Sequence, residues 1–348
     1  MAPAVTVGAT PPRPEAPAAA PAGRDEGRRT RRARLVLNPV HLRRFRTSVL
    51  GDLVAVLRWH GIEPDLLFTR AGTPLAPQVA EEAARYDLFL VWGGDGTVGD
   101  VATGLIGTGT PLGPLPAGTY NNIARALGLP PDPLAAARLL ADARPRSMDV
   151  GFAGGRLFLE AAGVGLDAAV FPFGERLKAR DLSALLPALL RLVRCRAAEM
   201  TLDLDDARGI RVRAPLVAIA NGPFYGAGFT VAPEARWDDG RLTVRVFEDT
   251  GLPALAWYFI NAAWHRLPRQ TTGLSFRARR VRVSSREPLA VHADGRVVGA
   301  TPMVFEAQAG ALCVLAPAGP LSAGPLRRRR RVSMDATTTR VSRRPVQA

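Results

Sequence analysis

The ten residues at positions 88–97, LFLVWGGDGT, join a continuous apolar run to a glycine-rich loop. The apolar part, 88–92, is short and has no alternating polar positions, which predicts a strand buried on both faces of a sheet. A helical pattern follows over 97–105. The stretch therefore predicts a strand, a tight loop and a helix, the repeating unit of a parallel α/β sheet.

The composition of this loop, Gly93-Gly94-Asp95-Gly96-Thr97, favours a phosphate ligand. Glycines carry no Cβ, so the backbone can come close to phosphate oxygens. The amides of Gly96 and Thr97 stand at the positive end of the following helix, which attracts anions. Asp95 is placed to contact a nucleotide or a metal-bound water. The alternative is an ordinary strand-to-helix turn, because the loop matches neither of the two common nucleotide-binding fingerprints.

A second loop of the same type lies at 116–122, with the sequence PAGTYNN, between a strand predicted at 111–115 and a helix predicted at 121–127. Taken alone, it is a helix cap in which Thr119 is the capping residue. The carboxyl ends of parallel strands meet at one edge of a sheet, so the two loops would face the same crevice. Together the loops favour nucleotide binding.

The alternation of strands and helices continues on both sides of these loops. Apolar periodicity predicts strands at 34–37 and 66–69, and helices at 44–60, 78–85 and 133–143. After Met148 short β-like runs dominate, separated by turn signals and interrupted by two helical insertions near 177–192 and 253–265. The sequence thus predicts a parallel-sheet α/β domain at 33–148 and a β-sandwich or closed-sheet domain at 149–320.

The net charge of +15 is concentrated at the two ends of the chain, where 1–32 and 321–348 are predicted to be disordered tails. Residues 1–34 carry +4 and residues 321–348 carry +7, which leaves about +4 for the body. A weakly charged body with few aromatic residues argues against nucleic-acid binding. The five arginines at 327–331 predict either contact with an anionic membrane or a solvated tail.

Targeting signals are not evident in the sequence. No apolar stretch approaches the roughly 20 residues of a membrane-spanning helix. The first 23 residues lack the pattern of a secretory signal. Cys195 and Cys313 are too few for a disulfide framework or a metal cluster. We therefore expect a cytoplasmic protein, and leave open a peripheral contact at the inner face of the membrane and a homodimer.

An ordered set of motifs gives the chain a resemblance to a known family. The two loops and ALGLP at 126–130 are followed by AGVGLD at 162–167, NGPFYGAG at 221–228, APEA at 232–235, DDG at 238–240 and HADG at 292–295. This order resembles the bacterial branch of the diacylglycerol kinase and sphingosine kinase family, over about residues 33–317. The resemblance implies an N-terminal α/β domain like that of phosphofructokinases and NAD kinases, a C-terminal β-sandwich domain, and an active site between them.

The resemblance also implies an ATP- and Mg²⁺-dependent lipid kinase that phosphorylates a lipid alcohol such as diacylglycerol, in phospholipid biosynthesis. The implied nucleotide-binding residues are Asn38, Pro39, Thr69, Gly93, Gly94, Asp95, Gly96, Thr97, Gly118, Thr119 and Asn121. Asp239 is implied in a magnesium site, for which a plain hairpin turn is the alternative. Asp294 is implied as the catalytic carboxylate.

Two positions depart from the family pattern. The Asn-Pro turn lacks its usual glycine and is followed by Arg43 and Arg44, which either contact phosphate or are solvated. Arg296 stands where the family has a glutamate, the presumed general base. If 294–296 is a strand, Asp294 and Arg296 share a face and can pair, unless Gly295 bends the chain.

Three functions remain open on the sequence alone. The first is an ATP-dependent lipid kinase, with an apolar stripe on the helix predicted at 182–193 either receiving acyl chains or packing in the core. The second is a catalytically weak relative that binds nucleotide or lipid, which Arg296 favours. The third is a kinase of a water-soluble substrate, against which the ordered C-terminal motifs argue.

Overall fold

The structure is a computed structural model that describes residues 29–42, 45, 48–165, 197–226, 228–247, 274–319 and 321. Several predictions fall on other residues: the helices at 177–192 and 253–265, Arg43, Arg44 and the arginine run at 327–331 lie outside the described residues. None of the described helices combines the length and the apolar character needed to cross a membrane.

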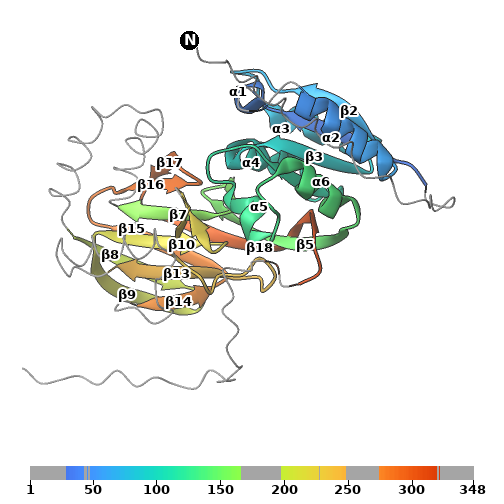
Figure 1. Cartoon of the computed structure of the whole chain (residues 1–348). Helices are drawn as coiled ribbons and strands as arrows, with labels where there is room; N and C mark the ends of the chain where they lie inside the picture. The colour runs from blue at the N-terminus through green and yellow to red at the C-terminus, as the bar shows by residue number, and fades with distance from the viewer. Residues whose placement is uncertain are drawn as a thin grey trace, which may run out of the picture.

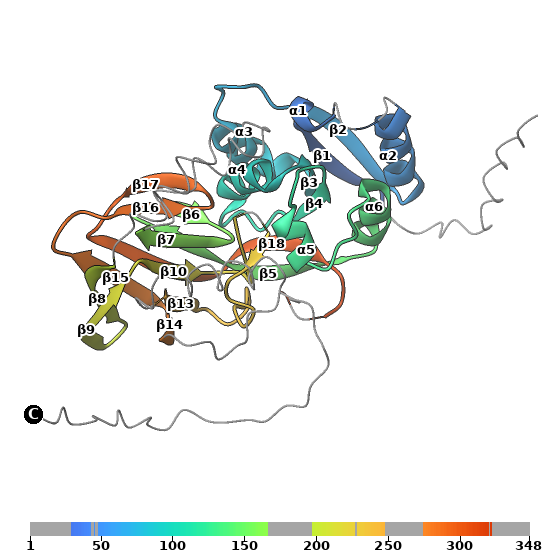
Figure 2. The same cartoon turned by 60° about the vertical axis from the view of Figure 1, so that its left-hand side comes forward.

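The predicted α/β part contains four parallel strands in the order β2-β1-β3-β4, with helices on both sides (Figure 1). These strands are β1 (Arg31–Leu37), β2 (Ile62–Phe68), β3 (Leu88–Gly93) and β4 (Leu112–Pro116). The helices are α1 (Pro39–Leu42), α2 (Ser48–Trp59), α3 (Leu75–Glu82), α4 (Asp95–Leu105), α5 (Asn122–Ala126) and α6 (Pro133–Ala141), with a 3₁₀ turn at Ala83–Arg85. Every residue of β3 is buried, because α2 and α6 pack on one face of the sheet and α3 and α4 on the other (Figure 2).

The second part of the chain is built from antiparallel strands. They are β5 (Arg144–Ala153), β6 (Arg156–Phe158), β7 (Ala161–Gly165), β8 (Ala198–Leu204), β9 (Ala207–Ala214), β10 (Leu216–Ala220), β11 (Phe224–Tyr225), β12 (Phe229–Thr230), β13 (Leu242–Phe247), β14 (Ser275–Ala278), β15 (Arg280–Ser285), β16 (Ala290–Ala293), β17 (Arg296–Ala300) and β18 (Met303–Ala316). A six-stranded sheet in the order β14-β13-β10-β7-β16-β17 packs against β8, β15 and β18 of the larger sheet. Leu202 and Val281 from the larger sheet and Ile219 and Val244 from the smaller one are buried in this shared core. The predicted fold class, a parallel α/β part followed by a β-sandwich, is confirmed.

The long strand β18 joins the two parts into one ten-stranded sheet. Near its end it pairs in parallel with β4, through Val314 and Leu112. Its first residues pair with β15, and β5 runs antiparallel along most of its length. In the sequence, only the apolar run at 311–316, one of the short β-like runs after Met148, indicates a strand here. Gly310, at φ +60°, and a shift of register between Gln308 and Leu312 interrupt the alternating pattern.

The contact between α3 and α4 depends on a glycine. A Cβ at Gly104 would lie 2.5 Å from the carbonyl oxygen of Ala76 and 2.8 Å from the Cβ of Val79. Gly99, in the same helix, has no atom within 4 Å of such a Cβ. We therefore expect Gly104→Ala to lower the free energy of unfolding by about 1–3 kcal/mol, because the two helices must separate.

The control variant, Gly99→Ala, is expected to be neutral or to raise the free energy of unfolding by about 0.5–1 kcal/mol, since alanine favours a helix more than glycine does. Chemical denaturation of both variants measures the difference. Equal effects of the two substitutions would contradict the close packing at Gly104.

Candidate functional site

The four parallel strands end at one edge of the sheet, and the predicted nucleotide-binding residues follow them there. Asn38 follows β1, and Thr69 follows β2, where its N–H donates to the Leu37 carbonyl at 2.8 Å. The first glycine loop continues β3 and the second continues β4. The prediction that both loops lie at the same edge is confirmed by the parallel pairing of β3 with β4.

The two glycine loops touch through their backbones. A Cβ on Gly118 would lie 2.6 Å from the Cα of Gly94, closer than a Cβ comes to another carbon in proteins. The N–H of Ala117 donates to the carbonyl of Gly93 at 3.1 Å. Asn121 adopts a left-handed backbone, with φ 49°, and its side chain bonds both the N–H and the carbonyl of Gly118, at 2.7 and 3.1 Å. The two loops therefore form one continuous backbone surface, beside which Thr119 is exposed.

Asn38 fastens the end of β1 to the same surface. Its Nδ2 donates to the Oγ1 of Thr97 at 3.0 Å, and its Oδ1 accepts the N–H of Val40 at 3.1 Å. Pro39 begins α1, whose residue His41 lies against the first loop, with Nε2 3.2 Å from a Cβ built on Gly94. His41 was not predicted, because only the folded chain brings α1 against this loop.

The start of α4 carries Asp95, whose Oδ1 accepts the N–H of Ile123 in α5 at 3.0 Å and so ties the two loops together. The N–H of Thr97 donates to the carbonyl of Gly94 at 3.0 Å. This amide is thus bonded within the loop, and its contact with a phosphate stays a prediction. In the part of the chain that the structure describes, no acceptor is found for the amide of Gly96.

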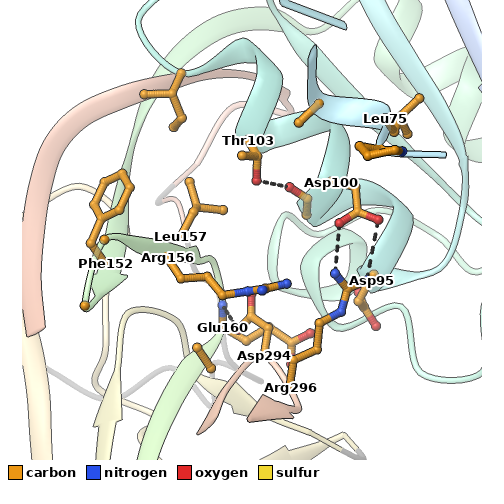
Figure 3. A pocket seen from close by; sticks show the side chains of 18 of the residues that line it. Leu75, Asp95, Asp100, Thr103, Phe152, Arg156, Leu157, Glu160, Asp294 and Arg296 are labelled. Carbon is orange, nitrogen blue, oxygen red and sulfur yellow. Dashed lines mark hydrogen bonds and ion pairs between the residues drawn. The ribbon is translucent and has the colours of Figure 1, made fainter. Parts of the chain in front are cut away.

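A cavity of about 910 Å³ opens next to Asp95 and Gly96, between the two parts of the chain (Figure 3). Residues of α3 and α4 form one wall, and the β5–β6 hairpin and the β16–β17 turn form the other. Apolar side chains in its lining are Leu75, Ile106, Phe152 and Leu157, and charged side chains are Asp95, Asp100, Arg156, Glu160, Asp294 and Arg296. The cavity and the glycine loops thus share the start of α4.

Asp294 lies in the tight turn between β16 and β17, where both it and Gly295 have positive φ, 42° and 76°. Asp294 as a whole residue is exposed and Gly295 is half-buried, but the carboxyl group of Asp294 is turned toward the backbone before β7. It accepts the N–H groups of Leu159, Glu160 and Ala161 at 2.7, 3.0 and 3.1 Å. The pKa of Asp294 is raised to about 6, mainly by loss of solvent around the carboxyl group and to a lesser extent by the negative charge of Asp95, while the three hydrogen bonds act to lower it.

Arg296 reaches across the cavity to α4, where its guanidinium pairs with Asp100 at 3.1 Å (Figure 3). It does not form the pair with Asp294 that a strand through 294–296 would allow. Asp294 is in a turn, so the two residues do not alternate as on a strand, and its carboxylate is held by backbone amides. A Cβ on Gly96 would lie 3.8 Å from Nη2 of Arg296, so the cation sits beside the start of α4.

Glu160 and Asn122 also meet in the cavity wall, and sequence reasoning did not single out either one. The Nδ2 of Asn122 donates to the Oε2 of Glu160 at 2.7 Å. A signal was present, because Glu160 is the one charged residue in the apolar run 157–165. Its partner comes from another domain, which a linear pattern does not reveal.

Asp239 is not among the residues that line the cavity. Its carboxylate forms an ion pair with Arg277 and accepts the N–H of Arg241 at 3.1 Å. Among the described residues, no group of three or more His, Cys, Asp or Glu side chains is arranged to hold a metal ion. The structure therefore places Asp239 in the turn before β13, outside the lining of the cavity.

Comparisons with known proteins agree with this architecture. Residues 32–153 match the diacylglycerol kinase catalytic domain, and residues 160–316 match the YegS C-terminal NAD kinase beta sandwich-like domain. A probable lipid kinase, YegS-like, from Pseudomonas putida is 34% identical over 299 residues, which cover 83% of this chain and 96% of that protein. A diacylglycerol kinase from Bacillus subtilis is 28% identical over 289 residues, which cover 79% and 93% of the two chains.

The fold also matches a solved structure. The crystal structure of a putative diacylglycerol kinase from Bacillus anthracis aligns with a TM-score of 0.73 at 24% identity, over 85% of this chain and 99% of that one. The resemblance predicted from the ordered motifs is confirmed. The chain belongs to the diacylglycerol kinase and YegS-like family of lipid kinases.

Proposed function

We propose that this protein is an ATP-dependent kinase that transfers the γ-phosphate to the hydroxyl of a lipid alcohol such as diacylglycerol. The observation that carries the proposal is the contact between the two glycine loops, directly beside the cavity at the start of α4. The nucleotide lies along the loops, and its phosphates point toward the amide of Gly96 and the positive end of α4. The acceptor enters from the cavity.

Magnesium fits the phosphate end of this site better than the turn at Asp239, where the guanidinium of Arg277 already pairs with the carboxylate. At the cavity, the charge of Asp95 raises the pKa of Asp294, and a divalent cation beside Asp95 would relieve that repulsion. Mg²⁺ keeps several water ligands and binds phosphates with one or two carboxylates, so Asp95 is the residue to hold it. When bound, the ion neutralises charge on the transferring phosphate.

The transfer is a displacement at phosphorus. The acceptor oxygen forms a bond to the γ-phosphorus, the bond to the β–γ bridging oxygen breaks, and ADP leaves. The hydroxyl proton passes to a carboxylate of the cavity wall, a role for which the family resemblance implies Asp294. Most of the acceleration comes from positioning and charge stabilisation.

The acceptor is assigned to the lipids because apolar side chains stand beside the carboxylates in the cavity, among them Leu75, Phe152 and Leu157. The names of the relatives from Pseudomonas putida and Bacillus subtilis support the same class. Contact with an anionic membrane, which would present such a lipid, stays a prediction that depends on 327–331.

A kinase assay tests the proposal. The purified full chain is incubated with labelled ATP, Mg²⁺ and a panel of lipid alcohols in mixed micelles, with water-soluble alcohols including NAD in parallel. We expect labelled phospholipid from at least one lipid alcohol and none when Mg²⁺ is chelated. If label appears only on a water-soluble acceptor, the protein is instead a kinase of a water-soluble substrate.

One observation favours a second function, a nucleotide- or lipid-binding protein without turnover. The Arg296–Asp100 ion pair spans the cavity beside the start of α4, where an acceptor hydroxyl has to pass. If this pair blocks the acceptor, Arg296→Ala turns an inactive wild type into an active kinase. If both proteins bind ATP and transfer no phosphate to any acceptor, the binding function replaces the kinase.

A further inference from the structure

Glu160 is a buried acidic residue in an otherwise apolar stretch, which suggests a functional role for its carboxylate. Glu160 is only 6% exposed and lies directly before the apolar strand β7. It nevertheless lines the cavity, together with Asp294, Arg156 and Arg296. A carboxylate without solvent is costly unless it is hydrogen-bonded and paired, and such groups concentrate at functional sites. Figure 3 shows Glu160 beside Asp294 on the wall opposite α4.

Three separate elements hold this residue in place. The side chain of Asn122 in α5, itself 1% exposed, donates to Oε2 of Glu160 at 2.7 Å and also contacts the carbonyl of Gly226. The backbone N–H of Glu160 donates to Asp294 at 3.0 Å. Its carbonyl accepts the N–H groups of Asn221 and Gly222 at 3.0 and 2.8 Å. An acid fixed from both parts of the chain has a defined position relative to the phosphate loops.

That position is linked to the phosphate end of the site by two neighbouring residues. Asn122 binds the Glu160 carboxylate, and the adjacent Ile123 donates its N–H to Asp95. A shift of α5 would therefore move the acid and the phosphate loop together. Such coupling is what a group acting on the acceptor oxygen requires, because the acceptor must stay aligned with the γ-phosphorus.

Asp294 is less suited than Glu160 to receive the proton of the acceptor hydroxyl. Its two oxygens together accept three backbone N–H groups, and a proton on either oxygen would weaken those bonds. The same bonds fix the backbone at 159–161, which carries Glu160. The geometry therefore gives Asp294 a positioning role.

We propose that Glu160 is the carboxylate that accepts the proton of the acceptor hydroxyl, with Asp294 and Asn122 as its positioning residues. This inference rests on the proposed function. In the transfer, the hydroxyl proton moves to the Glu160 carboxylate as the oxygen bonds to phosphorus, and the protonated acid returns the proton to solvent after ADP leaves. The charged side chains that line the same cavity are Arg156 and Arg296, which are cationic, and Asp95, Asp100 and Asp294, which are acidic.

Glu160→Gln tests the proposal in the full chain with saturating Mg²⁺ and ATP. Glutamine keeps the size of the side chain and an acceptor for Asn122, but cannot take up a proton. We expect kcat to fall by about 10²-fold, near the low end for general base catalysis, since the acceptor proton can leave late in a loose transition state. The KM for ATP and the thermal midpoint are expected to stay near wild type. The acid limb of the kcat profile is expected to disappear.

Two further variants separate catalysis from structure. Asp294→Asn cannot accept three N–H groups, so its loss of kcat is expected together with a lower thermal midpoint. Glu287→Gln, an exposed acid outside the cavity, serves as the control and is expected to keep wild-type turnover. If Glu160→Gln folds poorly, Glu160→Asp replaces it: a catalytic role predicts lower kcat with the acid limb retained.

The outcomes distinguish this inference from the proposed function. An active wild type and a Glu160→Gln variant within about three-fold of its kcat would overturn the role of Glu160 alone. The role of Glu160 would also be overturned if Glu160→Gln loses activity only in proportion to its loss of stability. A wild type that binds ATP and phosphorylates no lipid alcohol would overturn the proposed function, and this inference with it.

Discussion

Replacing Asp95 with alanine is expected to abolish phosphoryl transfer, with a loss of at least about 10³-fold in kcat/KM. Asp95 begins α4, binds the amide of Ile123 and is the residue assigned to the magnesium ion. The substitution removes a charge beside the phosphates and the bond between the two loops, and electrostatic contributions of this kind are often the largest in catalysis. Turnover of labelled ATP with the preferred lipid alcohol measures the effect.

The fold of the Asp95→Ala variant is expected to persist, with a thermal midpoint within a few degrees of wild type. The lost hydrogen bond to Ile123 costs about 1 kcal/mol, a small part of the stability of a chain of this size. Asp95→Asn is the matched control, since it keeps an acceptor for that amide and removes only the charge. If the Asp95→Ala variant binds and uses ATP normally, the proposal that the glycine loop with Asp95 holds the ATP phosphates and magnesium is wrong.

Gly118→Val is expected to lower ATP affinity by about 10²-fold or more. The Cβ would meet the Cα of Gly94 at 2.6 Å and the Oδ1 of Asn121 at 3.0 Å, so the two loops have to separate. A displacement of the order of 1 Å in a positioning group is enough for a loss of this size. Calorimetric titration with a non-hydrolysable ATP analogue measures the affinity directly.

Gly51→Ala provides the control, because it lies in the exposed part of α2, where a Cβ would have no atom within 4 Å. This variant is expected to bind the analogue like wild type. Unchanged affinity in Gly118→Val would mean that the nucleotide does not depend on the contact between the loops.

Much of the fold follows from local patterns, and the exceptions have physical causes. The buried strand β3 and the helix after it were predictable because an apolar run and a glycine loop determine local conformation. The first half of β18 was not predictable, because it pairs with β5 and β15, which lie elsewhere in the chain. Gly310 also breaks its alternation.

The candidate site divides in the same way. The glycine loops were predictable, since the carboxyl ends of parallel strands must share an edge. Asp100 and Glu160 were not predictable from the sequence. The partner of Asp100, Arg296, lies 196 residues away, and the partner of Glu160, Asn122, lies 38 residues away. Asp294 was identified through a resemblance, but the orientation of its carboxyl group became visible only with the turn conformation.

The position of β18 has a consequence for how the chain is made. The α/β part leaves the ribosome first, with β4 at an edge of its sheet, and the described strand that covers this edge comes about 190 residues later. An open strand edge can pair with another chain, so the growing protein carries a surface prone to aggregation until Met303–Ala316 has been synthesised. A chain that terminates before Met303 leaves β4, β5 and β15 without this common partner, and such fragments are therefore candidates for chaperone binding and degradation.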